Sequence, residues 1–344
     1  MNEARKTNIF IYLLIILKGF IIGIANIIPG VSGGTVALIL NIYKRMITAI
    51  GNLSLSTIKA IIKLFSFRKK HFNDFKKEMI RVDALFLVLL LLGAAAAIII
   101  FSNLITILLE TSHDITYGFF FGLILASIVI PFSKIKNKNF KVILSILIGI
   151  ALIIALSFII SDEQQISNAK MANEISMASH TEGIHIDAGK LIMMFITGML
   201  VTSAMILPGI SGSFIALIMG QYFLLLQAVS EREILILGVF AIGGLIGLKF
   251  FAKVMNYLFK KCHDIFMAFI SGLVLGSLWI MWPLKNTFII GDEMLYLSNK
   301  IPDLFGQNEW FTLAAFIVGI AIVIIMMLVK KSTRSSQKRS DNDL

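Results

Sequence analysis

Two short segments of this chain combine residue types that can bind an anion. They read Pro29-Gly30-Val31-Ser32-Gly33-Gly34 and Pro208-Gly209-Ile210-Ser211-Gly212-Ser213. Each interrupts a regular helix, because proline has no backbone donor and glycine adopts conformations that other residues avoid. A helix that begins after each break presents unpaired N–H groups and the positive end of its dipole, which together favour a phosphate or a carboxylate.

The small residues and hydroxyl groups of these breaks define a candidate substrate-binding set. Glycine lets an anion approach the backbone, and serine and threonine add hydroxyl donors. From the two segments the set contains Pro29, Gly30, Ser32, Gly33, Gly34, Thr35, Pro208, Gly209, Ser211, Gly212 and Ser213. In an alternative interpretation, the small residues only allow helices to pack closely in a membrane.

Two polar residues in the preceding apolar segment join this set. Lys18 could place a cation beside a bound anion, or its flexible stem could carry the ammonium group to the membrane interface. Asn26 lies one turn before Pro29, where its amide could orient a polar group. The equivalent residue before the second break is Met205, so this amide is not shared by both segments.

The composition of the chain requires a membrane environment. Of its 344 residues, 58% are hydrophobic and 15% are charged, and the mean hydropathy is +0.90. A soluble globular protein has roughly 45–50% apolar and about 25% charged residues, so a soluble enzyme and a disordered chain are both disfavoured. The single Cys262 excludes a disulfide scaffold, and the histidines are scattered, so we expect no metal and no cofactor.

Apolar segments of about 20 residues predict the membrane-spanning helices. Six segments are long enough to cross as they stand: 84–109, 115–133, 142–160, 234–258, 265–284 and 311–329. Two longer tracts, 9–50 and 190–229, contain the Pro-Gly breaks in their middle.

The distribution of basic residues predicts the orientation. The net charge is +11, and the Lys and Arg residues gather near the N-terminus, in the loop 44–82, around 134–141 and 253–261, and in the tail 330–344. Since cytoplasmic loops are enriched in Lys and Arg, both termini are expected in the cytoplasm and the loop 161–189 outside. The charge thus indicates a multi-pass protein of the cell membrane, surrounded by membrane lipids, and not a nucleic-acid-binding protein.

The chain also repeats itself. Residues 19–43 align with 198–222, with Gly19 and Gly198, Pro29 and Pro208, and Tyr43 and Tyr222 in register, and His113-Asp114 aligns with His263-Asp264. Each half is then one broken tract followed by three spans. Three crossings insert the second half upside down relative to the first, as in many secondary transporters.

Two placements of the breaks agree with this topology. Each tract could cross twice with its break as a surface turn, or form a re-entrant hairpin with its break near the midplane. Apolar neighbours such as Ile28 and Val31 favour re-entrance, because surface turns attract Asn, Asp and Lys. Two re-entrant tips from opposite sides would meet.

The predicted fold is therefore an all-α polytopic membrane protein with two inverted-topology repeats, each a re-entrant helical hairpin plus three transmembrane helices. Residues 1–160 form the first repeat, 161–189 an extracytoplasmic loop, 190–329 the second repeat and 330–344 a cytoplasmic tail.

The two His-Asp pairs admit two roles. A histidine in a membrane protein can carry protons near neutral pH, which leaves coupling to H+ or Na+ open. The favoured interpretation makes the pairs interface caps, because aspartate is a good N-cap for the span that follows.

The segments NIIPGVSGGTVALILNIY and SAMILPGISGSFIALIMGQY resemble the bacterial polyprenyl-phosphate transporter family (PopT), and the resemblance covers about 9–330. It implies a membrane flippase that returns undecaprenyl phosphate from the outer to the inner leaflet for reuse in cell envelope synthesis. An anionic head and an apolar tail fit a polar shelter that crosses about 30 Å of hydrocarbon while the tail stays in lipid.

Two other functions compete with this one. A transporter of a small soluble anion could use the same scaffold. A membrane phosphatase needs carboxylates and an arginine at the reacting phosphate. Because neither Pro-Gly segment contains Asp, Glu, Arg or His, we expect a transporter and not an enzyme.

Overall fold

The computed structural model covers the whole chain and describes all residues except 1, 29–30, 67, 160, 168–169, 171–186, 291–292, 303–305 and 343–344. Within the described residues, eight helices are long and apolar enough to cross a membrane. Their spanning parts are Ile9–Ile27, Ala84–Thr111, His113–Phe132, Phe140–Ser157, Ala188–Ile206, Ile234–Lys261, His263–Ile280 and Glu309–Val329. The chain is a multi-pass membrane protein, and the six uninterrupted spans predicted from the sequence are confirmed with small shifts at their ends.

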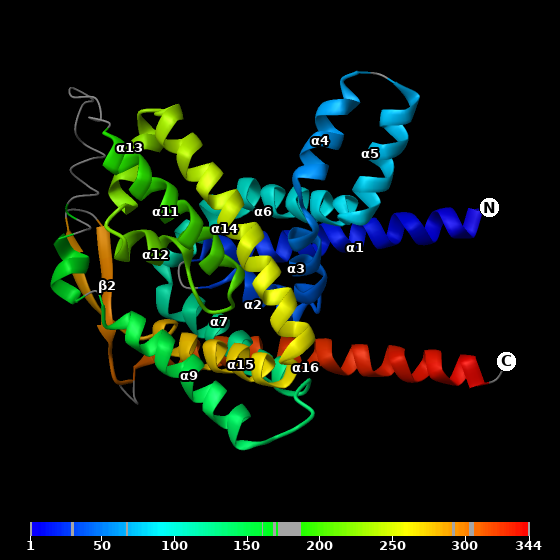
Figure 1. Cartoon of the computed structure of the whole chain (residues 1–344). Coiled ribbons are helices and arrows are strands. Elements are labelled where there is room, and N and C mark those ends of the chain that lie inside the picture. The colour runs from blue at the N-terminus through cyan, green and yellow to red at the C-terminus, as the bar shows by residue number, and fades with distance from the viewer. Residues whose placement is uncertain are drawn as a thin grey trace.

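These spans belong to long helices whose order repeats along the chain. In the first half they are α1 (Asn2–Ile27), α6 (Ala84–Thr111), α7 (His113–Ser127) with its short continuation α8 (Val129–Phe132), and α9 (Phe140–Ser157). In the second half they are α11 (Ala188–Ile206), α14 (Ile234–Lys261), α15 (His263–Ile280) and α16 (Gln307–Asn342). Both ends of the chain extend to the same side of the molecule in Figure 1.

The long helices pack in four close pairs, and glycines lie where each pair touches. α1 packs against α6 and α11 against α14, whereas α7 packs against α16 and α9 against α15. A Cβ atom on Gly19 would overlap the carbonyl of Leu90, and one on Gly198 would overlap the carbonyl of Phe240. Small residues allow this backbone approach in membrane helices, where packing drives association.

Short helices fill the two broken tracts. After the first break come α2 (Gly33–Ile39) and α3 (Tyr43–Asn52), and after the second come α12 (Gly212–Ile218) and α13 (Tyr222–Ser230). The pair α12–α13 bends by 112°, and α3 bends by 70° against α4 (Leu55–Leu64). Each bent pair has the geometry of a broken span or a re-entrant loop, which raises the total to as many as 10 spans in the described part of the chain.

The segment 44–82, expected as a basic loop, folds into helices. α4 and α5 (Lys69–Arg81) form a hairpin that projects from the bundle (Figure 1). Glu78 joins the two helices, because its carboxylate accepts hydrogen bonds from Thr57 at 2.6 Å, Ser56 at 2.9 Å and Arg81 at 2.6 Å. The high charge of this segment suggested a loop, but its polar side chains form hydrogen bonds between the two helices of the hairpin.

A short β-hairpin, not predicted from the sequence, accompanies the expected helical fold. Strands β1 (Lys285–Ile290) and β2 (Glu293–Asn299) form an antiparallel hairpin directly after α15. The predicted span 265–284 ends earlier, at Ile280, because Pro283 cannot continue the helix. Tyr296 of β2 stacks on the ring of His113 with 3.4 Å between the ring centroids, so the hairpin covers the start of α7.

Candidate functional site

The two Pro-Gly breaks meet at the centre of the molecule. Ser32 caps α2: its hydroxyl oxygen accepts a hydrogen bond from the backbone N–H of Gly34 at 3.2 Å. The same hydroxyl donates to the carbonyl of Leu207, in the second break, at 3.2 Å. A serine that caps one break thereby holds a carbonyl of the other, 175 residues away in the sequence.

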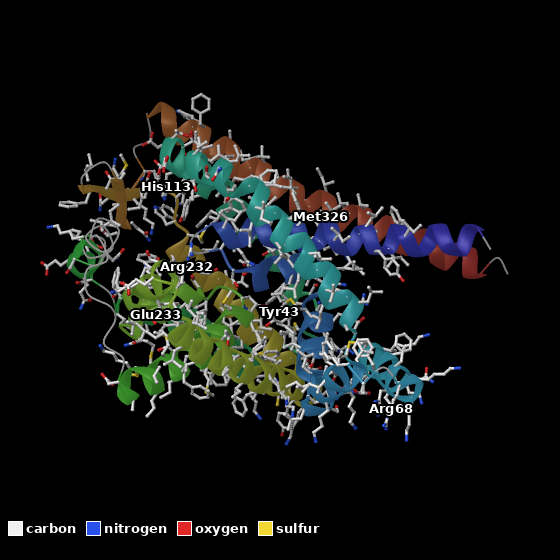
Figure 2. The ribbon with its side chains drawn as sticks, turned by 90° about the horizontal axis from the view of Figure 1, so that it is seen from above. Tyr43, Arg68, His113, Arg232, Glu233 and Met326 are labelled. Carbon is white, nitrogen blue, oxygen red and sulfur yellow. The ribbon has the colours of Figure 1, made fainter. Side chains whose placement is uncertain are left out.

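Two further contacts hold the breaks together. The hydroxyl of Tyr43 donates to the carbonyl of Ile206 at 3.0 Å, and Tyr43 is buried. Gly34 faces the same carbonyl so closely that a Cβ atom there would lie 2.8 Å from it. Figure 2 places Tyr43 near the middle of the molecule, between His113 toward one end and Arg68 toward the other. The breaks are therefore interior features, as expected of re-entrant tips that meet.

The second break depends on Gly209. Its φ is +85°, a conformation that glycine adopts at little cost. A Cβ atom on Gly209 would also lie 2.8 Å from the carbonyl of Leu273 and 3.0 Å from Cβ of Ser277, both on α15. Pro208 and Gly209 are buried, so this break is packed against α15.

The hydroxyl groups of the two breaks differ in what they bind. Ser211 makes no capping bond to the backbone; its hydroxyl pairs with that of Ser213 at 2.8 Å. Thr35 is 1% exposed, and its hydroxyl has no hydrogen-bond partner among the described residues. A buried hydroxyl without a partner costs about 1–3 kcal/mol. The break region thus holds a half-buried hydroxyl on Ser211, an exposed one on Ser213, and a buried one on Thr35 that no described residue binds.

The other predicted residues lie at different distances from this meeting point. The amide of Asn26 covers Gly33, where a Cβ atom would lie 3.0 Å from its nitrogen, and Met205 covers Gly212 in the same way. Lys18 is half-buried on α1, eight residues before Asn26, which corresponds to about 12 Å along a helix axis. Lys18 therefore lies about two helical turns away from the meeting point of the breaks. Pro29 and Gly30 lie outside the described residues.

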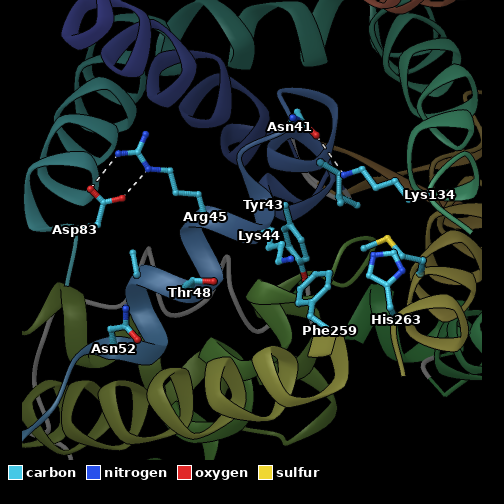
Figure 3. A pocket seen from close by; sticks show the side chains of 13 residues that line it. Asn41, Tyr43, Lys44, Arg45, Thr48, Asn52, Asp83, Lys134, Phe259 and His263 are labelled. Atoms are coloured by element: carbon cyan, nitrogen blue, oxygen red, sulfur yellow. Dashed lines mark hydrogen bonds and ion pairs between the residues drawn. The ribbon is translucent and has the colours of Figure 1, made fainter. Parts of the chain in front are cut away.

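A cavity of about 470 Å³ opens beside the meeting point (Figure 3). Its lining residues include three cations and one carboxylate: Lys44, Arg45, Lys134 and Asp83. The guanidinium of Arg45 forms two hydrogen bonds with Asp83, at 2.6 and 3.0 Å, and lies over the ring of Phe86. The ammonium of Lys134 donates to the side-chain carbonyl of Asn41 at 3.2 Å.

The two His-Asp pairs take equivalent positions in the halves. In each pair the histidine Nδ1 lies 3.1 Å from the aspartate Oδ1. The interpretation of Asp as the N-cap is wrong, because Ser112 and Cys262 hold the cap positions and each aspartate lies in the first turn. A carboxylate there still stabilises the helix through its dipole.

Comparison with known proteins identifies the family. Residues 22–295 match the model of a family described as undecaprenyl phosphate translocase-like. The chain belongs to this family. Its members are transporters of polyprenyl phosphates and not enzymes, so the resemblance and the expectation of a transporter are confirmed.

Two curated relatives cover most of the chain. A polyprenyl-phosphate transporter of Vibrio cholerae is 32% identical over 331 residues, which are 93% of this chain and 96% of the relative. A polyprenyl-phosphate transporter of Staphylococcus aureus is 29% identical over 287 residues, 80% of this chain and 88% of the relative. No solved structure matches the chain. The soluble-anion alternative finds no support among these relatives.

Sequence reasoning missed several residues around this site. Tyr43 was visible only as a repeated tyrosine, aligned with Tyr222, and nothing in the sequence showed that its hydroxyl reaches the opposite break. Asn41 and Lys134 are 93 residues apart, and their contact follows only from the fold.

Proposed function

We propose that this member of the translocase family returns undecaprenyl phosphate from the outer to the inner leaflet of the cell membrane. The phosphate head passes the meeting point of the two breaks while the polyprenyl tail stays in lipid. The observation that carries the proposal is the direct contact between the breaks, since Ser32 and Tyr43 bind adjacent carbonyls of the second break. Non-helical backbone inside a membrane is tolerated where protein or a polar cavity encloses it.

An inverted repeat would give both leaflets equivalent access to this point. The inverted repeat is supported by glycine contacts that occur at aligned positions of the two halves. Gly122 of α7 meets the carbonyl of Phe316 on α16, and Gly272 of α15 meets the carbonyl of Ile146 on α9. The third helix of each half thus packs against the other half, as expected for two intertwined repeats. Figure 2, which places His113 at the end opposite Arg68, agrees with cytoplasmic termini.

The hydroxyl groups of the breaks are the first candidates to hold the head. Ser211 and Ser213 present two hydroxyls whose present bond is only to each other. Thr35 has a buried hydroxyl with no partner among the described residues, which a phosphate oxygen could satisfy. The other described residues of the breaks, 31–34 and 208–212, would supply backbone N–H groups and space for the head.

Binding at this point would compete with a contact between the breaks. The hydroxyl of Ser32 donates its only proton to the carbonyl of Leu207. A phosphate oxygen that accepts the hydrogen bond of Ser32 in place of the Leu207 carbonyl would remove this contact between the two breaks. Binding of the head would therefore be linked to opening of the site, with or without coupling to H+ or Na+.

The test is transport by purified protein in liposomes. Labelled undecaprenyl phosphate should move between leaflets faster than in empty liposomes. The double substitution Ser211→Ala and Ser213→Ala should slow this movement without reducing the amount of folded protein. Ser133→Ala with Ser157→Ala is the matched control, because it removes two hydroxyls that bind carbonyls of their own helices away from the breaks. Equal rates in empty and protein-containing liposomes would reject the proposal.

A further inference from the structure

We propose that the cavity beside Tyr43 is a second binding site for a phosphate monoester, built from Asn41, Lys44 and Lys134. It would hold the head of the lipid on one side of the meeting point, so the inference rests on the proposed function. The cavity volume of about 470 Å³ lies within the range of ligand pockets, about 300–1,000 Å³.

The charge of the cavity fits a dianion. Asp83 is the one carboxylate among the lining residues, and it is bound to Arg45 through two hydrogen bonds. The three cations of the lining, Lys44, Arg45 and Lys134, thus outnumber its carboxylates by two. Lys44 forms no hydrogen bond or ion pair with the residues that the structure describes. A phosphate monoester carries about two negative charges at neutral pH and binds lysine through short, charge-assisted hydrogen bonds.

Asn41 positions one of these cations. It ends α2 with a φ of +56°, where glycine would be less strained, and its counterpart in the second half is Gly220 with a φ of +67°. The side chain at this strained position accepts a hydrogen bond from Lys134, whose ammonium is thereby held at the rim of the cavity (Figure 3). Asn41 therefore holds the ammonium of Lys134 in addition to forming the turn after α2.

The cavity connects directly to the meeting point. Tyr43 lines the cavity and also donates its hydroxyl to the carbonyl of Ile206 in the second break. A phosphate head bound in the cavity would therefore lie beside the side chain that holds the second break.

The second half has no equivalent of this cationic segment. Residues 41–45 read Asn-Ile-Tyr-Lys-Arg, whereas the aligned residues 220–224 read Gly-Gln-Tyr-Phe-Leu. His263 lines the cavity, whereas its counterpart His113 is 7% exposed and its ring stacks between Tyr117 and Tyr296. An anion site whose cations all come from one half favours the head on that side, which the charge distribution predicts to be cytoplasmic.

The experiment measures binding to the full-length protein by native mass spectrometry. The probes are farnesyl phosphate, farnesol and inorganic phosphate. Lys44→Gln with Lys134→Gln removes two cations from the cavity, and Lys136→Gln with Lys141→Gln removes the same charge from exposed positions outside it. Asn41→Gly removes the amide while matching the residue found at position 220.

We expect the cavity double variant to bind farnesyl phosphate at least about tenfold more weakly, because each hydrogen bond to a charged group contributes on this scale. The control variant should bind within about twofold of wild type, and Asn41→Gly should lie between the two. Competition by inorganic phosphate would show that the cavity also takes the free anion. If inorganic phosphate does not compete and farnesol binds more weakly than farnesyl phosphate, the cavity takes the phosphate only as part of the lipid.

Equal affinity of the cavity and control variants for farnesyl phosphate would overturn the inference. The liposome assay, run on the same proteins, separates this failure from a failure of the proposed function. If wild type moves undecaprenyl phosphate and both double variants bind and transport alike, only the cavity site is rejected. If wild type does not move the lipid, the transport proposal fails, whatever the binding data show.

Discussion

Replacing Gly34 with alanine tests the contact between the breaks in the most direct way. The added Cβ atom would lie 2.8 Å from the carbonyl of Ile206 and 3.4 Å from the nitrogen of Pro208. Cβ atoms essentially never come within 3.0 Å of another heavy atom, so one of the two breaks must move. The second break is itself in contact with α15 at Gly209, which leaves it little room to withdraw.

The expected loss of stability follows from two opposing terms. Alanine in place of glycine in a helix stabilises by at most about 1 kcal/mol. Forcing an extra carbon into a packed interior costs about 1–3 kcal/mol. For Gly34→Ala we therefore expect a net loss of up to about 2 kcal/mol in the free energy of unfolding.

Gly238→Ala is the matched control. Gly238 lies within α14, and nothing lies within 4 Å of the position of its Cβ atom. The same chemical change should there be neutral or stabilising, up to about 1 kcal/mol. Reversible unfolding in mixed micelles should give opposite signs for the two variants. If Gly34→Ala proves as stable as Gly238→Ala, the breaks do not lie in contact as described.

Three further predictions use other contacts of the chain. Tyr43→Phe should lower the free energy of unfolding by about 1–2 kcal/mol, because it leaves the buried carbonyl of Ile206 without its hydrogen bond; an unchanged unfolding curve would contradict this role. The hydrogen bonds from Arg81, Thr57 and Ser56 lower the pKa of Glu78 to about 2. Since this pKa lies below its usual value, the stabilisation is complete above about pH 4.5 and is lost as the pH falls toward 2. The protection of amide hydrogens in α4 and α5, measured as the intrinsic exchange rate at each pH divided by the observed rate, should therefore fall toward acid pH in wild type and change little in Glu78→Gln. Parallel protection profiles in the two proteins would refute this role of Glu78. On a Cys262→Ser background, Ser66→Cys should react with an impermeant reagent only from the cytoplasmic side and Ser298→Cys only from the other side. Reaction of both cysteines from the same side would contradict the proposed topology.

The spans were predictable because the membrane imposes a length and a composition on each one. The chain has too many apolar residues for one water-facing core, and an apolar stretch of about 20 residues has few alternatives to a spanning helix. The contact between the breaks was predictable from the sequence repeat. Two copies of one interruption, inserted from opposite sides, are expected to occupy equivalent places, and Ser32 and Leu207 do lie within hydrogen-bond distance.

The features that sequence reasoning missed depend on tertiary contacts. The strands 285–290 and 293–299 follow Pro283 in a chain rich in apolar residues, where a short alternating pattern is hard to distinguish from a helix end. The helices within 44–82 have their polar contacts inside a hairpin, around Glu78, so charge alone suggested a loop. The cavity brings Asn41 to Lys134, 93 residues further along the chain, and no local pattern encodes such a contact.

A reversible cross-link between the breaks tests the central claim most directly. Ser32→Cys and Leu207→Cys, combined on a Cys262→Ser background, replace the residues joined by the hydrogen bond at 3.2 Å. The account predicts that oxidation links the two residues within one chain and stops movement of undecaprenyl phosphate in liposomes, and that reduction restores it. A fully cross-linked protein that transports at the rate of the reduced one would show that the head does not pass between the breaks.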